Sequence, residues 1–442
     1  MLIRSKMANL TIRSSPSLET SDPKIIEVVR SCLHKMNRVA EIKFASIPGS
    51  DLKKFFRDLP KSAPQLHTLC IRSFSSKTAF SIHDDFLYDT ENLRHVELIN
   101  CKISWDSRLL TGLTRLTLQV SLKANSSIIQ VLQALQRMPA LTNLHLKDSI
   151  PDDAEGPFTY AVVDLPCLRV LDISSDVGAV TAVLRHITFP RSAILNLTCN
   201  GNQSIEIDFS SFFSALATRF LSTLVIRSLS VRNSYSHNTH NLKFYLWTTA
   251  PIQDCFPTLQ LFESQLQLVL KWPTSEPHSY VKVVTCAFDA MDLSFLTQLQ
   301  IKALDYFDSR SWIKTFGKLP LLERVCVKRS ALQSFLESLV YKTKAAEKSE
   351  AAFLNVSFPK LRDIHLVDIH FKSFVNSPSV FDTLLDCLME RCERNAEVQV
   401  LRLDDCSYVS SDEVERLKEV AVDVIWDGLE QLIEYYSDSN GC

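Results

Sequence analysis

The chain has 442 residues, 46% of them hydrophobic, and a formal net charge of -2 at pH 7. This composition suits a large folded core, and the near-neutral charge gives no general attraction to nucleic acid or to an anionic membrane. The sequence holds 8 glycines and no GxGxxG, GxxxxGK[ST] or GxSxG phrase, so the usual glycine-dependent phosphate loops and nucleophile elbow are absent. We therefore expect no nucleotide cofactor and no nucleic-acid partner.

The 12 cysteines are scattered along the chain and form no CxxC pair. Such cysteines are typical of reduced thiols that pack as small apolar side chains in intracellular proteins. The first residues lack the apolar core of a signal peptide, and no apolar run reaches about 18 residues, the length that a membrane helix needs. The sequence predicts a cytoplasmic or nuclear protein without a membrane segment.

The first predicted region, residues 1–37, is a polar lead-in followed by a capping helix. The lead-in is rich in Ser and Thr. Apolar residues recur at helical spacing after Pro23, and Asp22 is a candidate N-cap for this helix. A first, degenerate strand is expected at Val39–Phe44.

A strand phrase of the form LxxLxL recurs along residues 38–426. Its copies are Leu66-Leu69-Ile71, Leu93-Val96-Leu98, Leu113-Leu116-Leu118, Leu141-Leu144-Leu146, Leu168-Leu171-Ile173, Leu221-Leu224-Ile226, Leu296-Leu299-Ile301, Leu322-Val325-Val327, Leu361-Ile364-Leu366 and Val398-Leu401-Leu403. The most regular copies begin about 20–28 residues apart, close to the period of leucine-rich repeats. One such unit cannot bury its apolar face alone, so the copies are expected to stack.

The repeat predicts an α/β fold, a leucine-rich-repeat solenoid (horseshoe) with a concave parallel sheet and convex helices. The strands should form one continuous parallel sheet with Leu116, Leu144 and Leu171 in the same core column. Segments between the strands, such as 127–138 and 178–187, have helical periodicity and are expected on the convex side.

The middle of the solenoid, residues 228–290, departs from the repeat. It opens with a polar break, and the period-two patterns at 242–246 and 266–270 then predict strands without the full phrase. We expect the sheet to continue through this region with irregular connections.

The last part of the chain carries a charged insertion, a closing strand and an acidic tail. The insertion, residues 341–358, is rich in Lys, Glu and Ala. Cys406 follows the last phrase at the turn position of the cysteine-containing repeat, as Cys101 does in an earlier copy. An alternating pattern ending at Trp426 predicts the closing strand, and residues 427–442 form the acidic tail.

No grouping of residues in the sequence predicts catalysis or metal binding. His237 and His240 lie in the polar break without a further ligand at suitable spacing, which favours a solvated loop. Cys387 and Cys392 fall about 140° apart around a helix, too far for one metal ion, so both are expected to be buried thiols. We expect no metal, no cofactor and no enzymatic activity.

Candidate binding residues come from the geometry of the repeat. The apolar residues of LxxLxL face the core, so the residues before, between and after the last two face the opposite, concave surface. From this mostly polar column we select as protein-binding candidates Arg115, Gln119, His145, Lys147, Arg227, Lys302, Arg324, Lys328 and Arg402. Its later part is basic and would suit an acidic or phosphorylated protein segment. Alternatively, these side chains only keep the exposed sheet face soluble.

The phrases LRHVELINC and VQVLRLDDC, the prolines before several copies, such as Pro139 and Pro166, and the terminal VDVIWDG resemble the F-box leucine-rich-repeat proteins of fungi over residues 38–430. The resemblance implies the substrate-recognition region of an F-box-like ubiquitin-ligase receptor, in which an amino-terminal F-box binds the Skp-type adaptor. Residues 1–37 show no F-box, so the adaptor is expected as a partner only if an F-box lies upstream. Two alternatives remain: a leucine-rich-repeat scaffold or regulator unconnected to ubiquitin, and, more remotely, an enzyme with a site in residues 228–290.

Overall fold

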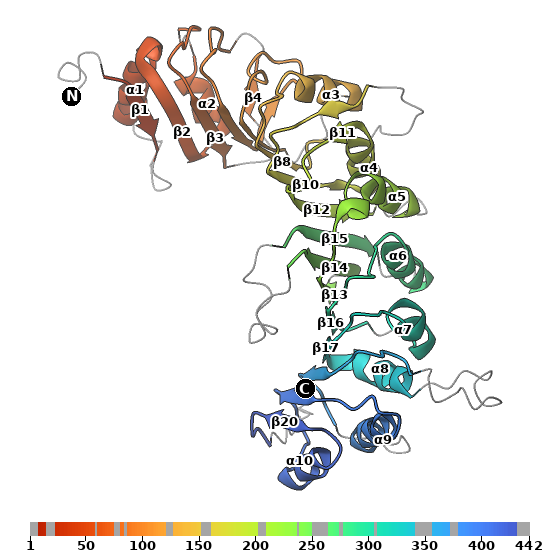
Figure 1. The fold of residues 1–442 in the computed structure, drawn as a ribbon. Helices are drawn as coiled ribbons and strands as arrows, with labels where there is room; N and C mark the ends of the chain where they lie inside the picture. The colour runs from red at the N-terminus through yellow and green to blue at the C-terminus, as the bar shows by residue number, and fades with distance from the viewer. Residues whose placement is uncertain are drawn as a thin grey trace. The chain divides into compact units, whose positions relative to one another are not determined.

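The computed structural model describes residues 8–14, 23–57, 60–74, 80–83, 86–120, 127–151, 161–201, 209–236, 238–249, 264–273, 277–304, 307–340, 356–371 and 379–430. The chain divides into two compact units, Met1–Thr223 (the first unit) and Leu224–Cys442 (the second unit). Each unit is of the α/β class, with a mostly parallel sheet and helices (Figure 1), an architecture compatible with a solenoid.

A parallel sheet runs through the first unit. Its strand order is β1-β2-β3-β5-β7-β8-β10-β12, and neighbouring strands in this order are parallel. Each connection must therefore return to the same end of the sheet, usually through a helix. The strands are β1 (Leu10–Arg13), β2 (Val39–Ile47), β3 (Thr68–Ser73), β5 (His95–Ile99), β7 (Arg115–Gln119), β8 (Asn143–Lys147), β10 (Val170–Asp176) and β12 (Ile194–Asn200).

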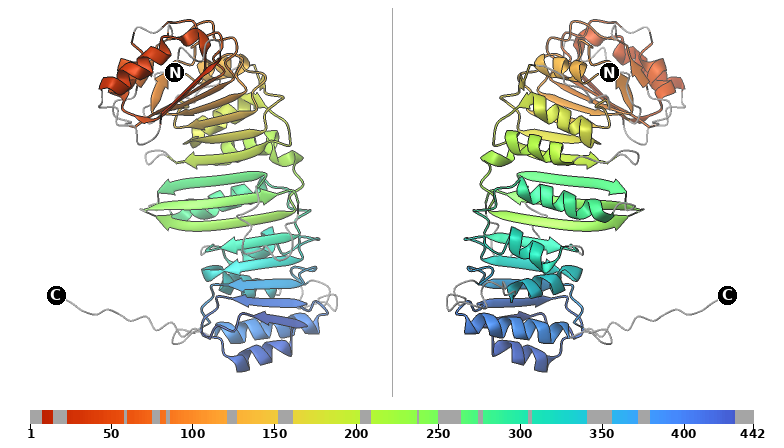
Figure 2. Two further views of the ribbon diagram at one scale, coloured as in Figure 1. Left: turned by 90° about the vertical axis from the view of Figure 1, so that its left-hand side faces the viewer. Right: turned by 90° about the vertical axis from the view of Figure 1, so that its right-hand side faces the viewer.

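Helices and short strand pairs make up the connections of the first unit. They are α1 (Pro23–Leu33), η1 (Met36–Arg38), α2 (Gly49–Phe55), α3 (Ile128–Gln136), α4 (Val177–His186), α5 (Phe209–Arg219), η2 (Leu221–Thr223), the pair β4 (Phe80–Ile82) and β6 (Cys101–Ile103), and the pair β9 (Val163–Asp164) and β11 (Ile187–Thr188). Figures 1 and 2 show α3, α4 and α5 on one face of the sheet. Helix α3 begins with a capping box, in which Ser127 and Gln130 satisfy each other's backbone N–H groups. The helices predicted at 127–138 and 178–187 are confirmed.

The apolar residues of the repeat phrase form the core of the first unit. Leu144 lies in register with Leu116 on one side and with Leu171 on the other. All three side chains are 0% exposed. The predicted core column is therefore confirmed.

The second unit opens with an antiparallel meander and continues as a parallel sheet, in the order β15-β14-β13-β16-β17-β18-β19-β20. β14 pairs antiparallel with both β13 and β15, whereas the pairs from β13 to β16 and onward to β20 are parallel. The strands are β13 (Ser228–Ser236), β14 (Thr239–Trp247), β15 (Leu266–Pro273), β16 (Gln298–Lys302), β17 (Arg324–Lys328), β18 (Asp363–Val367), β19 (Val400–Asp404) and β20 (Asp423–Trp426).

Figure 1 shows helices α6 to α9 along one face of this sheet. The helices of the second unit are α6 (Pro277–Asp289), α7 (Ser309–Thr315), η4 (Arg329–Ala331), α8 (Leu332–Leu339), α9 (Val380–Glu393) and α10 (Ser411–Lys418). None of the helices in the described parts of either unit combines the length and the hydrophobicity that a membrane crossing requires.

The predicted polar break at the start of 228–290 is wrong, because this segment is a β-hairpin. β13 and β14 pair along their whole length. Leu229 and Val231 alternate with polar residues and are 0% exposed, so two apolar side chains suffice to anchor β13. Asn238, in the turn between the strands, has a φ of 57°, a conformation that Asn adopts more readily than most residues. The prediction of one continuous parallel sheet is also wrong here, whereas the strands predicted at 242–246 and 266–270 are confirmed.

The repeat copy assigned to Leu221-Leu224-Ile226 is wrong. Residues 221–223 form the short helix η2, and the strand begins only at Ser228. The true copy is Ile226-Leu229-Val231, because Leu229 and Val231 lie in register with Leu299 and Ile301. The residues Leu221, Leu224 and Ile226 fit the phrase as well as Ile226, Leu229 and Val231 do. Only the pairing of β13 with β16 distinguishes the two assignments.

The structure also bears on the predicted lead-in, charged insertion and closing strand. The lead-in contains a strand, β1, which pairs with β2. Phe358, placed in the charged insertion, is 0% exposed and belongs to the core, while residues 341–355 of that insertion and 431–442 of the acidic tail lie outside the described residues. The closing strand is confirmed as β20, with Val424 and Trp426 in register with Leu401 and Leu403.

Candidate functional site

We call the sheet face that carries the residues before, between and after the last two apolar residues of each phrase the polar face. On β7 and β8 of the first unit its side chains are accessible, since exposed or partly exposed positions alternate with buried ones along both strands. Arg115 and Lys147 are exposed, and Gln119 and His145 are partly exposed. His145 Nδ1 lies 3.3 Å from Asp172 Oδ2 on the next strand. The structure thus brings these four candidate residues together on one face.

In the second unit the middle of the polar face is buried. Gln300 and Cys326 are 0% exposed and His365 is 3% exposed. Gln300 Oε1 accepts hydrogen bonds from Ser230 Oγ at 2.8 Å and from Arg232 at 2.9 Å. The prediction of an exposed polar column is therefore wrong between β16 and β18, because these polar side chains bond one another instead of water.

Arg324 is held by an ion pair and does not project freely from the sheet. Its Nε lies 2.7 Å from Asp363 Oδ2, and the two side chains are only 14% and 12% exposed. Burying a pair of this kind costs free energy, because both charges lose their hydration. The attraction between the two partners offsets this cost. Arg324 therefore belongs to the structural interior of the unit, contrary to its selection as a binding residue.

Arg227 differs from its predicted setting, whereas Arg402 does not. Arg227 precedes β13, so its selection from a strand copy at Leu221-Leu224-Ile226 was wrong. Its guanidinium lies 5.7 Å from the centroid of the Phe295 ring. Arg402 lies on β19 in register with His365 and is partly exposed, as the repeat predicts.

Three cations stand in register on adjacent strands in the second unit. Arg232 of β13 pairs with Lys302 of β16, which pairs with Lys328 of β17. We call these three residues the cationic row. Burial lowers the pKa of Lys302, and the neighbouring cations, Arg329 first, lower it further. Arg329 itself lies 2.6 Å from Asp368.

The two lysines of the cationic row differ from Arg324 in their surroundings. Across the described ranges, no carboxylate lies within ion-pair distance of Lys302 or Lys328. Both side chains are partly exposed. Sequence analysis found these two lysines but not Arg232, because the frame of the phrase before β13 was misplaced.

Acid is expected to destabilise the second unit through His365. Its Nε2 lies 2.5 Å from Asp404 Oδ2, yet burial outweighs the attraction of this carboxylate and lowers the pKa of His365 below its ordinary value of 6.5. The unfolded chain then binds the proton more readily, so stability that is complete above pH 6.5 is lost as the pH falls from there through the folded-state pKa. Urea titrations at several pH values should give a shallower loss of unfolding free energy in His365→Gln than in the wild type. Equal slopes would contradict this assignment.

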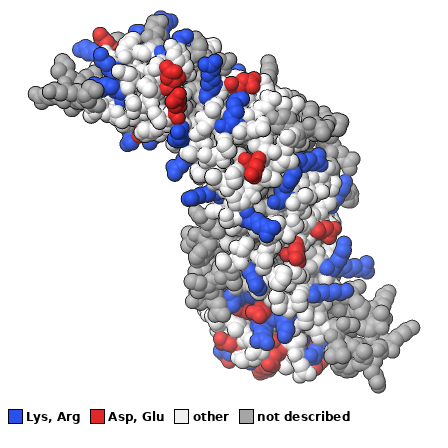
Figure 3. Space-filling view, turned by 45° about the horizontal axis from the view of Figure 1, so that its top comes forward, with Lys and Arg blue, Asp and Glu red and all other residues white. Residues whose placement is uncertain are grey.

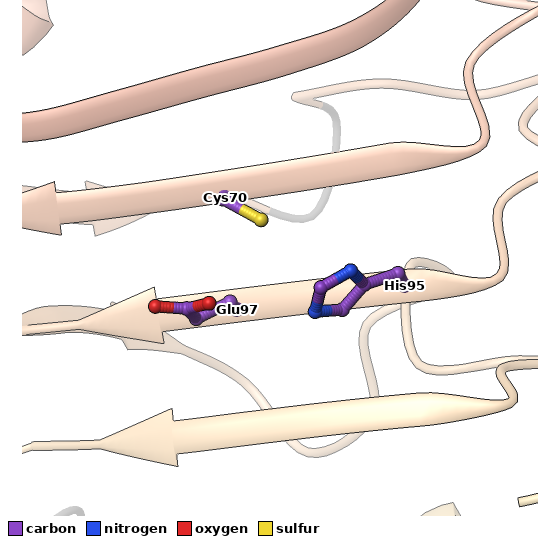
Figure 4. A group of neighbouring side chains, drawn as sticks. All are labelled: Cys70, His95 and Glu97. Carbon is purple, nitrogen blue, oxygen red and sulfur yellow. The ribbon is translucent and has the colours of Figure 1, made fainter. Parts of the chain in front are cut away.

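The structure brings together a thiol, an imidazole and a carboxylate on the polar face of the first unit. Cys70 lies on β3, and His95 and Glu97 lie on the adjacent β5 (Figure 4). Their ligand-type atoms all lie within 4.8 Å of one another. We call these three residues the Cys-His-Glu group.

Burial shifts the pKa values of Cys70 and His95 in opposite directions. It raises the pKa of the Cys70 thiol to about 11, with a further contribution from Glu97, and it lowers the pKa of His95. Arg72 Nε donates a hydrogen bond to Glu97 Oε1 at 2.5 Å. This group was not predicted from the sequence, because Cys70 lies in a different copy from His95 and Glu97. Comparing equivalent positions in successive copies would have found it, since Cys70 and Glu97 both stand between the last two apolar residues.

The remaining sequence candidates do not form a site. Cys387 is buried and Cys392 is exposed, so the two thiols do lie on different sides of α9, but the expectation that both are buried is wrong. His240 is 2% exposed and stacks on Trp272 with a centroid separation of 5.1 Å. It belongs to an aromatic cluster and not to a solvated loop, while His237 lies outside the described residues.

The charge on one face of the molecule is mixed. On the face shown in Figure 3, Lys and Arg side chains are interspersed with Asp and Glu. Such a face produces no single-sign field of the kind that attracts long polyanions.

No protein-family model matches the chain, and no curated protein is significantly similar to it.

Proposed function

We propose that the chain is a non-enzymatic protein-binding solenoid of the leucine-rich-repeat type, and that its cationic row receives an acidic or phosphorylated segment of a partner protein. The observation that supports this most directly is the register of Arg232, Lys302 and Lys328 on three adjacent strands.

The row has an electrostatic cost that a bound anion would offset. Like charges directly opposite each other on neighbouring strands destabilise a sheet. Lys302 has a cation on each side, and its lowered pKa reflects burial and these neighbours. An anion between Lys302 and Lys328 would relieve the repulsion and accept charge-assisted hydrogen bonds from both ammonium groups.

A short protein segment suits the row better than nucleic acid does. Strands about 4.8 Å apart place three cations over about 10 Å, which is the length of about three extended residues. Acidic side chains stand close by, because Asp368 pairs with Arg329 and Asp404 pairs with His365. These carboxylates would repel a long polyanion but leave room for one phosphate or two carboxylates.

A direct binding measurement tests the proposal. The probe is a fluorescent Asp- and Glu-rich peptide with one phosphoserine, titrated with the full chain and followed by anisotropy. The double variant Lys302→Gln, Lys328→Gln should weaken binding by about 3–6 kcal/mol, since each of the two lost charge-assisted hydrogen bonds contributes about 1.5–3 kcal/mol. The melting temperature should stay unchanged or rise, because the repulsion between the two lysines is removed.

Lys147→Gln is the matched control, because Lys147 follows the last apolar residue of its copy, as Lys302 and Lys328 do, but lies in the first unit. It should leave peptide affinity unchanged. Equal affinity of the wild type and the double variant would reject the cationic row as the site. Tighter binding of an RNA oligonucleotide of equal charge would reject a protein segment as its occupant.

The resemblance to F-box leucine-rich-repeat proteins extends the proposal. In that form the bound segment belongs to a substrate of a ubiquitin ligase, and the Skp-type adaptor binds an F-box outside the repeats. Mixing the full-length natural protein with purified Skp-type adaptor and separating the products by size tests this extension. A stable complex would support the ligase receptor, and separate elution would favour the scaffold or regulator.

A further inference from the structure

We propose that the Cys-His-Glu group of the first unit, Cys70, His95 and Glu97, is a binding site for one divalent transition-metal ion, with Zn²⁺ as the ion that its donor set fits best. This site is independent of the cationic row and of the partner proposed for it.

The sheet presents the three donors from neighbouring strands in fixed register. Cys70 pairs with Glu97, and Thr68 pairs with His95, along β3 and β5. Residues two apart on β5 point to the same face. Figure 4 shows the Cys70 thiol directed toward β5 and the His95 ring extending along β5 in the direction of Glu97, whose carboxylate lies along the same strand. Sites built on strands hold their ligands more precisely than sites on loops.

The separations are within reach of metal coordination. The ligand atoms lie within 4.8 Å of one another, and tetrahedral Zn²⁺ with bonds of about 2.0–2.3 Å brings its ligands to about 3.5 Å from one another. Side-chain rotations that move the ligand atoms by about 1 Å would bring them to this separation. His95 is partly exposed and can make such a rotation without moving the core.

The chemistry of the donors favours zinc. A thiolate, an imidazole nitrogen and a carboxylate oxygen are all ligands that Zn²⁺ accepts, and three protein ligands leave the fourth position for water. Arg72 holds Oε1 of Glu97 by a hydrogen bond, so Oε2 is the oxygen presented to the ion. Such an outer partner orients a ligating carboxylate. On binding, the Cys70 thiol loses its proton to solvent and the sulfur bonds to the ion.

Neighbouring charges modulate the affinity. Arg115 lies across from His95 on β7, and Lys43 lies across from Cys70 on β2. Glu41 pairs with Lys43 at 2.6 Å and with Arg13 at 3.0 Å, which offsets part of this positive charge. Because Arg115 repels a divalent cation, Arg115→Gln should strengthen metal binding, whereas loss of a ligand should weaken it.

The test is metal titration of the full chain after chelator treatment. Zn²⁺ is titrated in competition with a chromophoric chelator, and Co²⁺ is added separately to detect a thiolate-to-cobalt charge-transfer band. We expect one ion per chain and a clear charge-transfer band. Cys70→Ser should abolish the band and weaken Zn²⁺ binding by about 100-fold or more, since even loss of an outer partner costs about 10–100-fold. His95→Gln and Glu97→Gln, at partly exposed positions, should each weaken binding while the chain stays folded.

Two controls separate this site from incidental binding. Cys392→Ser removes an exposed thiol elsewhere, and His145→Gln removes an imidazole that pairs with a carboxylate on the same sheet. Both should keep the wild-type affinity and spectrum. Absence of stoichiometric Zn²⁺ in the wild type would overturn the proposal. So would wild-type affinity in both His95→Gln and Glu97→Gln, or an equal loss in Cys392→Ser.

Discussion

Replacing Leu144 by Ala is expected to lower the free energy of unfolding by about 2–5 kcal/mol. The side chain is 0% exposed and is flanked in register by Leu116 and Leu171. Strands on both sides hold the surrounding residues in place, so the cavity cannot collapse, and its cost adds to the lost transfer free energy. Urea unfolding followed by circular dichroism gives the measurement.

Lys147→Ala, three residues along the same strand, provides the control. Lys147 is exposed on the polar face, and its truncation should change stability by no more than about 0.5 kcal/mol. A small effect of both variants would contradict the register of β8.

Arg324→Ala is expected to destabilise the second unit by about 3–5 kcal/mol, because it leaves Asp363 as an uncompensated charge at a site only 12% exposed. The effect should appear in thermal and urea unfolding without any ligand. Loss of peptide binding in this variant would follow from loss of structure, so Lys302 and Lys328 are the appropriate positions for testing the binding surface.

The double variant Arg324→Met, Asp363→Leu distinguishes the ion pair from simple packing. Replacing both partners of a buried pair by apolar residues of similar volume is often neutral or stabilising. The double variant should therefore recover most of the stability that Arg324→Ala loses. Equal destabilisation by the single and double variants would show that the charge of Asp363 is not the cause.

Apart from the copy near residue 226, the sequence by itself determined the strands of the repeat and the residues of each strand that face the core. The spacing in Leu113-Leu116-Leu118 and its counterparts assigns core residues directly, because side chains alternate along a strand. The cysteine that follows the phrase was also predictable from the sequence, because Cys101 and Cys406 stand at the same position of their copies. In the structure each sulfur lies within 3.4 Å of the carbonyl oxygen two residues earlier. These features depend on residues close together in the chain.

The tertiary structure decided what the polar face does. Exposure on that face cannot be derived from one strand, since it depends on what the neighbouring strands contribute. The residue that follows the last apolar residue of the phrase shows this. It is exposed at Lys147, partly exposed at Lys302 and Lys328, and buried at Val367, which is 6% exposed. Pairing likewise joined Arg324 to Asp363 and turned a candidate binding cation into part of the interior.

The frame of the phrase near residue 226 and the Cys-His-Glu group were also decided only by the tertiary structure. Leu224 and Leu229 both fit the leucine position locally, and the register with Leu299 on β16 selects Leu229. Cys70 stands alone in its copy, so the group becomes visible only when the position that it shares with Glu97 in the next copy is known to lie beside it. Stacking parallel strands about 4.8 Å apart brings equivalent positions of successive copies side by side, so residues far apart in the chain become neighbours.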